Sequence, residues 1–311
     1  MSRIHEALKK AAQDRAAQTP TAVTADLVDG AAEINRHIEP TEDSIRAERL
    51  RLEAPDPRFK DERVLSYEEL VKRCSHPKWT LDARNSVFVG ADSDRVGAER
   101  FRTLRSRLYQ IAGAQQLKKL LITSSIPAEG KTFVAANLAQ SIVRQPDRRV
   151  LLIDADLRAS RLHQTLGAPS GPGLSDYLSG EVDEYAIIQN GLEGNLCFIP
   201  GGHQVANPSE LLLRDRMKTL LDRMAEVFDW IIIDSPPALP VHDASMLADQ
   251  CDGVLFVVRA GSTDSEIAQR VAAEFRDKNL LGVVLNRVDS ADTYSSYYYY
   301  GGDAEGAAAR K

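Results

Sequence analysis

The sequence predicts an α/β fold with a doubly wound, mostly parallel sheet. Two observations lead to this expectation. From about residue 86 onward, short apolar runs alternate with longer amphipathic runs, and the short runs are apolar at nearly every position. Strands of this kind are buried on both faces, and parallel strands need a crossover segment between them. The alternation therefore indicates one sheet with helices on both faces.

The expected elements follow that alternation along the chain. A helix over 94–112 comes first, because its apolar residues recur at helical spacing. Strands are expected at 120–123, 150–154, 196–200, 230–234, 254–259 and 282–286. Further helices are expected at 131–144, 208–228, 243–248 and 264–278. Together these elements form a domain predicted over residues 86–290.

The two ends of the chain differ in composition from this domain. Residues 1–85 are rich in charge and interrupted by prolines, with weak helical segments at 2–15 and 65–73, and this predicts a largely disordered linker region. Residues 291–311 hold five of the nine tyrosines, followed by a stretch rich in glycine and alanine, which predicts a flexible tail. Those five are Tyr294, Tyr297, Tyr298, Tyr299 and Tyr300.

Composition excludes several classes of protein. Thirty-nine Lys and Arg against forty-five Asp and Glu give a formal net charge of −6, which argues against a dedicated nucleic-acid binder. No apolar run approaches the ~18 residues of a membrane span, and the N-terminus lacks the apolar core of a signal peptide. Three widely spaced cysteines predict neither a disulfide framework nor a zinc knuckle. We therefore expect a cytoplasmic protein.

The segment 123–132, with the sequence TSSIPAEGKT, has the features of a phosphate-binding loop. It follows an expected strand and opens an expected helix, so backbone N–H groups and the helix N-terminus can hold phosphates. The strict pattern has glycine where this chain has Ser125, and a plain strand-to-helix turn with a surface lysine is the alternative. The residues expected to contact a nucleotide are Ser125, Pro127, Ala128, Glu129, Gly130, Lys131 and Thr132.

Three aspartates lie at the ends of two expected strands. Asp154 and Asp156 come at the end of the strand over 150–154, and Asp234 ends the strand over 230–234. Ligands in such sheets bind at the carboxyl ends of the strands. Carboxylates gathered there can hold the water around Mg²⁺ and orient a nucleophile. For each aspartate taken alone, capping of a following helix is the alternative.

These motifs together resemble those of the deviant-Walker P-loop ATPases, and within them the bacterial tyrosine kinases of capsule and exopolysaccharide synthesis. The family's loop, Ser-x-x-Pro-Gly-Glu-Gly-Lys-Ser/Thr, is similar to residues 124–132, with Ala128 in place of a glycine. Its apolar-Asp-x-Asp-x-Arg and apolar-Asp-Ser/Thr-Pro-Pro motifs are similar to residues 153–158 and 233–237. The C-terminal tyrosine cluster also resembles that of the family, and the resemblance covers about residues 87–300.

The resemblance implies phosphate transfer from ATP to the tail tyrosines, mainly in trans, with ATP and Mg²⁺ as cofactors. Asp154 or Asp156 would accept or orient the phenol proton, and Asn286 would lie beside adenine. The five tail tyrosines would be the phosphoacceptors. The catalytic residues implied are Lys131, Asp154, Asp156 and Arg158. The metal ligands implied, directly or through water, are Thr132, Asp154 and Asp234.

Glu99, Arg102 and Arg105 match a motif that joins subunits of this family into a ring. Residues three apart share a helix face, so this motif can present its charges to a neighbour, whereas a solvated charged face is the alternative. The resemblance also implies a membrane activator of the polysaccharide co-polymerase type, a cognate tyrosine phosphatase and no nucleic-acid partner. It places the protein in the cytoplasm, at the inner face of the plasma membrane through that activator.

Three other functions are alternatives to a kinase. A partition or division-site ATPase of the same superfamily would carry a signature lysine five residues before Lys131, where this chain has Ile126. A GTPase would read guanine with Asn-Lys-x-Asp, but residues 286–289 lack the lysine. A scaffold with a decayed site is supported only by Ala128, which is costly if that position requires a positive φ. The motifs taken together favour the kinase.

Overall fold

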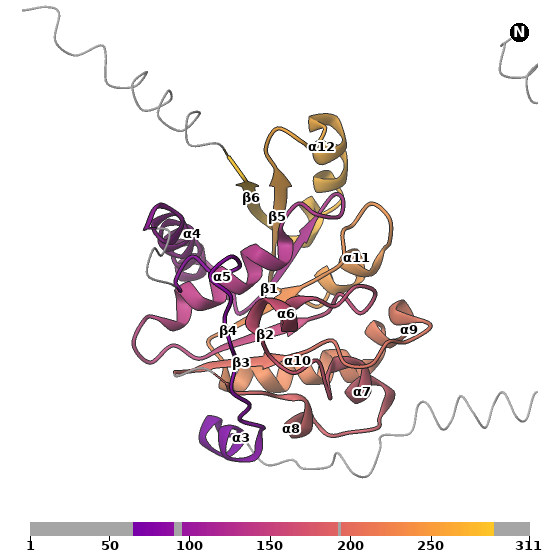
Figure 1. The fold of residues 1–311 in the computed structure, drawn as a ribbon. Helices are drawn as coiled ribbons and strands as arrows, with labels where there is room; N and C mark the ends of the chain where they lie inside the picture. The colour runs from indigo at the N-terminus through magenta and orange to yellow at the C-terminus, as the bar shows by residue number, and fades with distance from the viewer. Residues whose placement is uncertain (1–64, 90–94, 192–193, 289–311) are drawn as a thin grey trace, which may run out of the picture. The chain divides into compact units, whose positions relative to one another are not determined.

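The computed structural model describes residues 65–89, 95–191 and 194–288, which contain a six-stranded parallel sheet (Figure 1). The strand order is β3-β2-β4-β1-β5-β6, and every neighbouring pair is parallel. The doubly wound parallel sheet predicted from the sequence is therefore confirmed. The strands are β1 (Lys119–Ser124), β2 (Val150–Asp154), β3 (Leu196–Ile199), β4 (Trp230–Asp234), β5 (Gly253–Arg259) and β6 (Leu280–Asn286).

Helices connect the strands and flank the sheet. Across the described ranges, none of them is long and apolar enough to cross a membrane. The longer helices are α4 (Arg95–Ala114), α5 (Lys131–Val143), α10 (Asp215–Val227) and α12 (Ser265–Ala273). The shorter ones are α3 (Tyr67–Arg73), α6 (Leu162–Leu166), α7 (Leu174–Ser179), α8 (Glu184–Ile187), α9 (Pro208–Leu212), α11 (Asp243–Ala248) and the 3₁₀-helix η3 (Arg276–Lys278).

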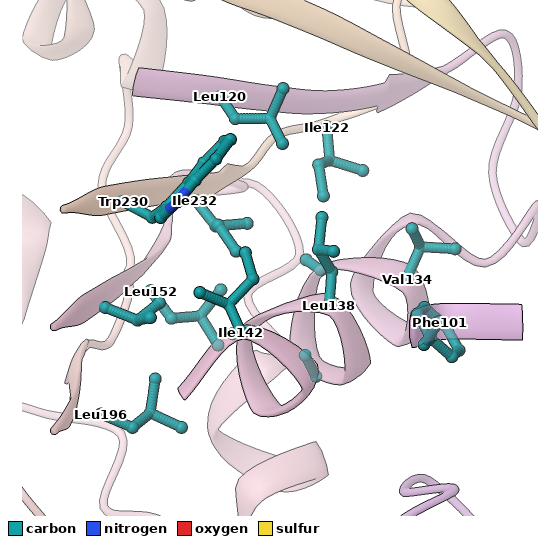
Figure 2. Packing of buried hydrophobic residues seen from close by; sticks show 14 of the residues in the cluster. Phe101, Leu120, Ile122, Val134, Leu138, Ile142, Leu152, Leu196, Trp230 and Ile232 are labelled. Carbon is teal, nitrogen blue, oxygen red and sulfur yellow. The ribbon is translucent and has the colours of Figure 1, made fainter. Parts of the chain in front are cut away.

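One face of the sheet packs against α5 through alternate strand residues (Figure 2). Burial of each such aliphatic side chain stabilises the fold by about 1.5–3 kcal/mol. α10 packs against β4 and α11 against β1, so helices also cover the other face. This core fixes α5, and with it the loop that precedes α5. The residues concerned include Leu120, Ile122, Leu152, Leu196, Trp230 and Ile232 on the strands and Val134, Leu138 and Ile142 on α5.

The described chain before α4 forms a strap over the sheet and α5, which we define as residues 74–89. The strap follows α3, the helix predicted over 65–73. Ser66 caps that helix by accepting from the N–H of Glu69, at 3.1 Å. Trp79, within the region predicted as a linker but itself expected to pack against the core, is buried, edge-on against Phe198. The predictions for the rest of the linker region and for the tail fall on 1–64 and 289–311, which lie outside the described residues.

Three local predictions differ from the structure. The single helix predicted over 208–228 is wrong, because Arg214 adopts an extended conformation (φ −66°, ψ 147°) and separates α9 from α10. The helix predicted over 264–278 ends at Ala273, and η3 follows it. The sequence analysis missed α6, α7 and α8, which have only four to six residues each and too few turns for a clear period.

Candidate active site

The phosphate loop runs from the end of β1 to the start of α5. Gly130 precedes α5 with a φ of 99°, which favours glycine. A Cβ atom at this position would lie 2.0 Å from the Nδ2 atom of Asn286. The Asn286 amide donates to the Glu129 carbonyl at 2.9 Å, so the end of β6 holds the loop. The positive φ therefore favours glycine here, and a larger residue would also displace the Asn286 amide from the loop.

The Glu129 side chain braces the loop from inside the protein. Its carboxylate is buried and accepts from the Ile126 N–H at 2.8 Å. It also accepts from the Thr263 hydroxyl at 2.6 Å and the Arg259 N–H at 3.3 Å. Both of these donors lie at or just beyond the end of β5. The carboxylate thus ties the loop to the sheet, and the predicted nucleotide contact of Glu129 stays a prediction.

Lys131, Thr132 and Asp234 come together where the loop meets β4. The Thr132 hydroxyl donates to Asp234 Oδ2 at 2.6 Å. Lys131 is only 7% exposed, and its positive charge acts to lower the pKa of Asp234. A buried ammonium beside a buried carboxylate supplies charge that water cannot screen well. The residues predicted for phosphate and metal thus share one small site.

Asp154 and Asp234 end neighbouring strands and lie opposite each other in the β2–β4 register. Burial raises the pKa of Asp154 to about 6, although hydrogen bonds from Ser160 and the Leu162 N–H oppose the shift. Burial and then the charge of Asp154 raise the pKa of Asp234 to about 8. Two carboxylates in one dry site resist carrying two negative charges. The pair therefore tends to keep a proton when no metal is bound, and a bound cation can take the place of that proton.

Asp156 and Arg158 follow β2 but have different partners. The Asp156 carboxylate accepts from the Ala159 N–H at 3.1 Å, and its side chain is partly exposed. Arg158 donates to Asp243 through Nε at 2.7 Å and through an Nη atom at 3.2 Å. Although burial opposes it, the bonds from Arg158 and Ser209 keep the pKa of Asp243 below its ordinary value.

The sequence analysis missed Asp243 and Ser209 as members of this cluster. Ser209 lies in α9 and Asp243 begins α11, so neither adjoins the Arg158 motif in sequence. Nothing in the spacing identifies which aspartate pairs with Arg158, because the contact depends on how the helices pack.

Comparison with known proteins connects this site to a family. Residues 120–299 match the family model of the CobQ/CobB/MinD/ParA nucleotide binding domain. The tyrosine-protein kinase YwqD of Bacillus subtilis is 33% identical to the chain over 220 residues, which cover 70% of this chain and 92% of that protein. The chain belongs to the bacterial tyrosine-protein kinases. Residues 120–299 are therefore a nucleotide-binding domain.

Further members of the bacterial tyrosine-protein kinases agree in sequence and fold. The tyrosine-protein kinase etk of Escherichia coli K12 is 37% identical over 220 residues. The match covers 69% of this chain, but the chain spans only about 30% of etk. The kinase domain of Escherichia coli ETK superposes with a TM-score of 0.58 at 34% identity, over 64% of this chain and 79% of that one. The VpsO kinase domain gives a TM-score of 0.57 at 28% identity, over 64% and 100%.

The residues of this site have the chemistry needed to bind a nucleotide with Mg²⁺. The Asp234 Oδ1 and Ser125 Oγ atoms are buried and have no hydrogen-bond partner among the described residues. Buried polar atoms are normally satisfied, so the unpaired Asp234 oxygen, within the field of the Lys131 charge, is free to accept a ligand. Within the described ranges no three His, Cys, Asp or Glu side chains form a metal cluster. Thr132 and Asp234 suit Mg²⁺, which keeps water and phosphate oxygens as its other ligands.

Ala128 is the main departure from the loop of the bacterial tyrosine-protein kinases. It has a φ of 65°, in the left-handed region that favours glycine. A non-glycine residue in this region costs about 1 kcal/mol or more. The side chain is exposed, so the strain lies in the backbone and not in a clash. The loop keeps its hydrogen bonds despite that cost.

Ala128→Gly is expected to raise the free energy of unfolding by up to about 1 kcal/mol, because glycine relieves the backbone strain. Chemical denaturation of the nucleotide-free protein measures the change. Ala114→Gly is the control, since Ala114 is an exposed residue that ends α4 without a positive φ. There glycine should lower stability. A loss of stability in Ala128→Gly would contradict the strain argument.

The predicted assembly motif lies on α4 but is only partly open to a neighbour. Glu99 and Arg102 are exposed and pair with each other at 2.8 Å. Arg105 instead donates to the Ser141 carbonyl on α5 at 2.5 Å. The sequence analysis expected all three side chains on one face for a partner. In the structure, Arg105 is engaged with its own chain, and the assembly role stays a prediction.

Proposed function

We propose that the protein is an ATP-dependent protein-tyrosine kinase that phosphorylates Tyr294, Tyr297, Tyr298, Tyr299 and Tyr300, mainly in trans. The observation that carries the proposal is the opposed pair Asp154 and Asp234, beside the loop lysine Lys131. Relatives named tyrosine-protein kinases support the choice of acceptor. Its role would be to control polymerisation and export of capsule or exopolysaccharide.

In the proposed reaction, the phenol oxygen of a tail tyrosine attacks the γ-phosphorus of ATP. The bond from that phosphorus to the bridging oxygen breaks and ADP leaves, while the phenol proton passes to a carboxylate. Lys131 would neutralise the outer phosphates, and Thr132 and Asp234 would hold Mg²⁺, which would supply further positive charge to the phosphates. Catalysis of this kind depends on positioning and electrostatics.

Asp156 is the carboxylate that we assign to the phenol proton. Asp154 is buried, and its two oxygens already accept from the Asp156 N–H, Ser160 and the Leu162 N–H. Asp156 is partly exposed at the same strand end, so a substrate can approach it. Asp154 would then hold the loop after β2 and act on Mg²⁺ through water. Asn286 remains the proposed adenine contact, at the end of β6.

Intact-mass spectrometry after incubation with ATP and Mg²⁺ tests this function. The wild-type chain should gain phosphate on the five tail tyrosines, and phosphatase should remove it. A variant with those five tyrosines replaced by phenylalanine should gain almost none but should still bind ATP. Bound ATP without any phosphotyrosine in the wild type would overturn the kinase and favour an assembly ATPase or a scaffold.

The same samples test self-assembly into a ring through Glu99, Arg102 and Arg105. Each phosphotyrosine adds roughly −1.5 to −2 charge, so several in a row would repel one another and nearby carboxylates. Phosphorylation should therefore loosen an assembly held by tail contacts. Sedimentation should show a smaller species after phosphorylation, and an unchanged mass would remove the idea. We further propose a cytoplasmic protein held at the plasma membrane by a polysaccharide co-polymerase activator and reset by a phosphatase.

A further inference from the structure

The segment after β4, residues 235–242, lies along the phosphate loop and is fixed at both ends. The Ala238 N–H donates to the Ser124 carbonyl at 2.8 Å, and the Leu239 N–H donates to the Ser125 carbonyl at 3.0 Å. At its far end the segment leads into Asp243, which is paired with Arg158. Leu239 is therefore held at a set position beside the loop.

The apolar side chain of Leu239 is exposed to solvent and is not part of the packed core. Its side chain is 45% exposed, whereas residues 235–238 just before it are buried. Other large apolar side chains are exposed in the described ranges, namely Val96, Leu213, Val283 and Leu285. Of these five, Leu239 is the one whose own backbone is bonded to the phosphate loop. Leu239 thus places an exposed apolar side chain at the edge of the site where phosphate transfer is proposed.

From this arrangement we infer that Leu239 is a specificity-determining residue, which packs against the ring of the acceptor tyrosine. The inference rests on the proposed kinase function and adds a residue to it. A tyrosine side chain is an apolar ring with a polar tip, so one end can pack on leucine while the hydroxyl faces the phosphates. Water, the acceptor in ATP hydrolysis, has no such ring.

The occupant that we assign to this contact is a tyrosine of the 294–300 segment. Asn286 ends β6 and donates to the phosphate loop, so the chain beyond it starts at this edge of the site. Tyr294 follows Val288 by six residues, a length that spans at most about 20 Å when extended. The tail therefore begins beside the loop, and the acceptor that we assign to Leu239 is a tyrosine of this segment, from the same chain or from a second copy in the assembly proposed above.

The test separates enzyme from substrate. The enzyme is the full chain with its five tail tyrosines replaced by phenylalanine, and the substrate is the full chain carrying Lys131→Met with an intact tail. In the enzyme, Leu239→Ser should raise the KM for this substrate about tenfold, the change expected from losing roughly 1.4 kcal/mol of apolar contact. kcat and the affinity for ADP should stay unchanged, and Leu239→Met should restore the KM.

Leu213→Ser is the matched control, because Leu213 is also an exposed leucine, at 58%, without a bond to the phosphate loop. It should leave the KM unchanged. An active parent enzyme whose KM is unaffected by Leu239→Ser would overturn this inference alone. Loss of ADP affinity in Leu239→Ser would also overturn it, since that result indicates a damaged loop. No phosphotyrosine from the parent enzyme would overturn the proposed function and this inference together.

Discussion

Replacing Lys131 with methionine is expected to abolish tyrosine phosphorylation and leave the protein folded. Methionine has a similar length and is tolerated in buried positions, so the packing around the start of α5 should survive. The positive charge at the outer phosphates is lost, and removal of one such electrostatic group commonly costs about 10²–10³ in rate. Intact-mass spectrometry with ATP and Mg²⁺ measures the loss, and circular dichroism checks the fold.

Lys119→Met is the matched control for that experiment. Lys119 begins the same strand that leads to the loop, but its ammonium pairs with Asp222 at 3.0 Å, away from the site. Surface pairs of this kind contribute little to stability, so activity should persist. Full activity of the Lys131→Met protein would contradict the assignment of the phosphate site, because no other residue in the loop carries a positive charge.

Asp234→Asn is expected to abolish phosphate transfer and, without metal, to stabilise the protein above about pH 8. Burial raises the pKa of Asp234 from 3.8 to about 8. The folded state therefore binds more protons than the unfolded state between those pH values. The free energy of unfolding must fall as the pH rises through that window, by up to about 1.4 kcal/mol per pH unit for one proton.

The asparagine variant removes this titration, so its stability should depend less on pH. A residual slope should remain, because burial also raises the pKa of Asp154, to about 6. Thermal unfolding of the protein in EDTA from pH 5 to pH 9 measures both slopes. Each kcal/mol of stability shifts the melting temperature by about 2–4 °C in a domain of this size. Asp222→Asn should keep the wild-type slope, and an unchanged slope in Asp234→Asn would show that Asp234 is already charged.

The sequence predicted the sheet because β1 to β5 are apolar runs buried along most of their length, whereas β6 at the edge is partly exposed. β2 and β4 have the predicted bounds because their continuous apolar runs end at Asp154 and Asp234, and α11 also has the predicted bounds. The loop and its carboxylates were predicted for the same reason, because these residues lie at strand ends. Features that depend on packing were not predicted. Arg158 finds Asp243 across the fold, and the brace from Glu129 to Thr263 joins residues distant in sequence.

Backbone conformation set a second limit on prediction. The sequence showed that Ala128 replaces a glycine but could not decide whether its φ is positive, and the structure gives 65°. Arg214 interrupts the helix predicted over 208–228, although its residue type is a good helix former. In both cases the backbone conformation differs from the intrinsic preference of the residue type, which the sequence alone does not reveal.

The strap has a consequence for how a minimal fragment of this protein should be cut. Asn137 and Gln140 lie on α5 and are buried, and their amide groups bond to the backbone of Asn85 and Val87 and to the hydroxyl of Ser86. A fragment started after residue 87 would remove the donors to the side-chain oxygens of both residues, at up to about 1–3 kcal/mol for each oxygen left unpaired, while their NH2 groups keep their bonds within α5. The helix weakened by such a cut is the one that carries Lys131. Cutting ahead of Leu65 keeps every described partner of that helix.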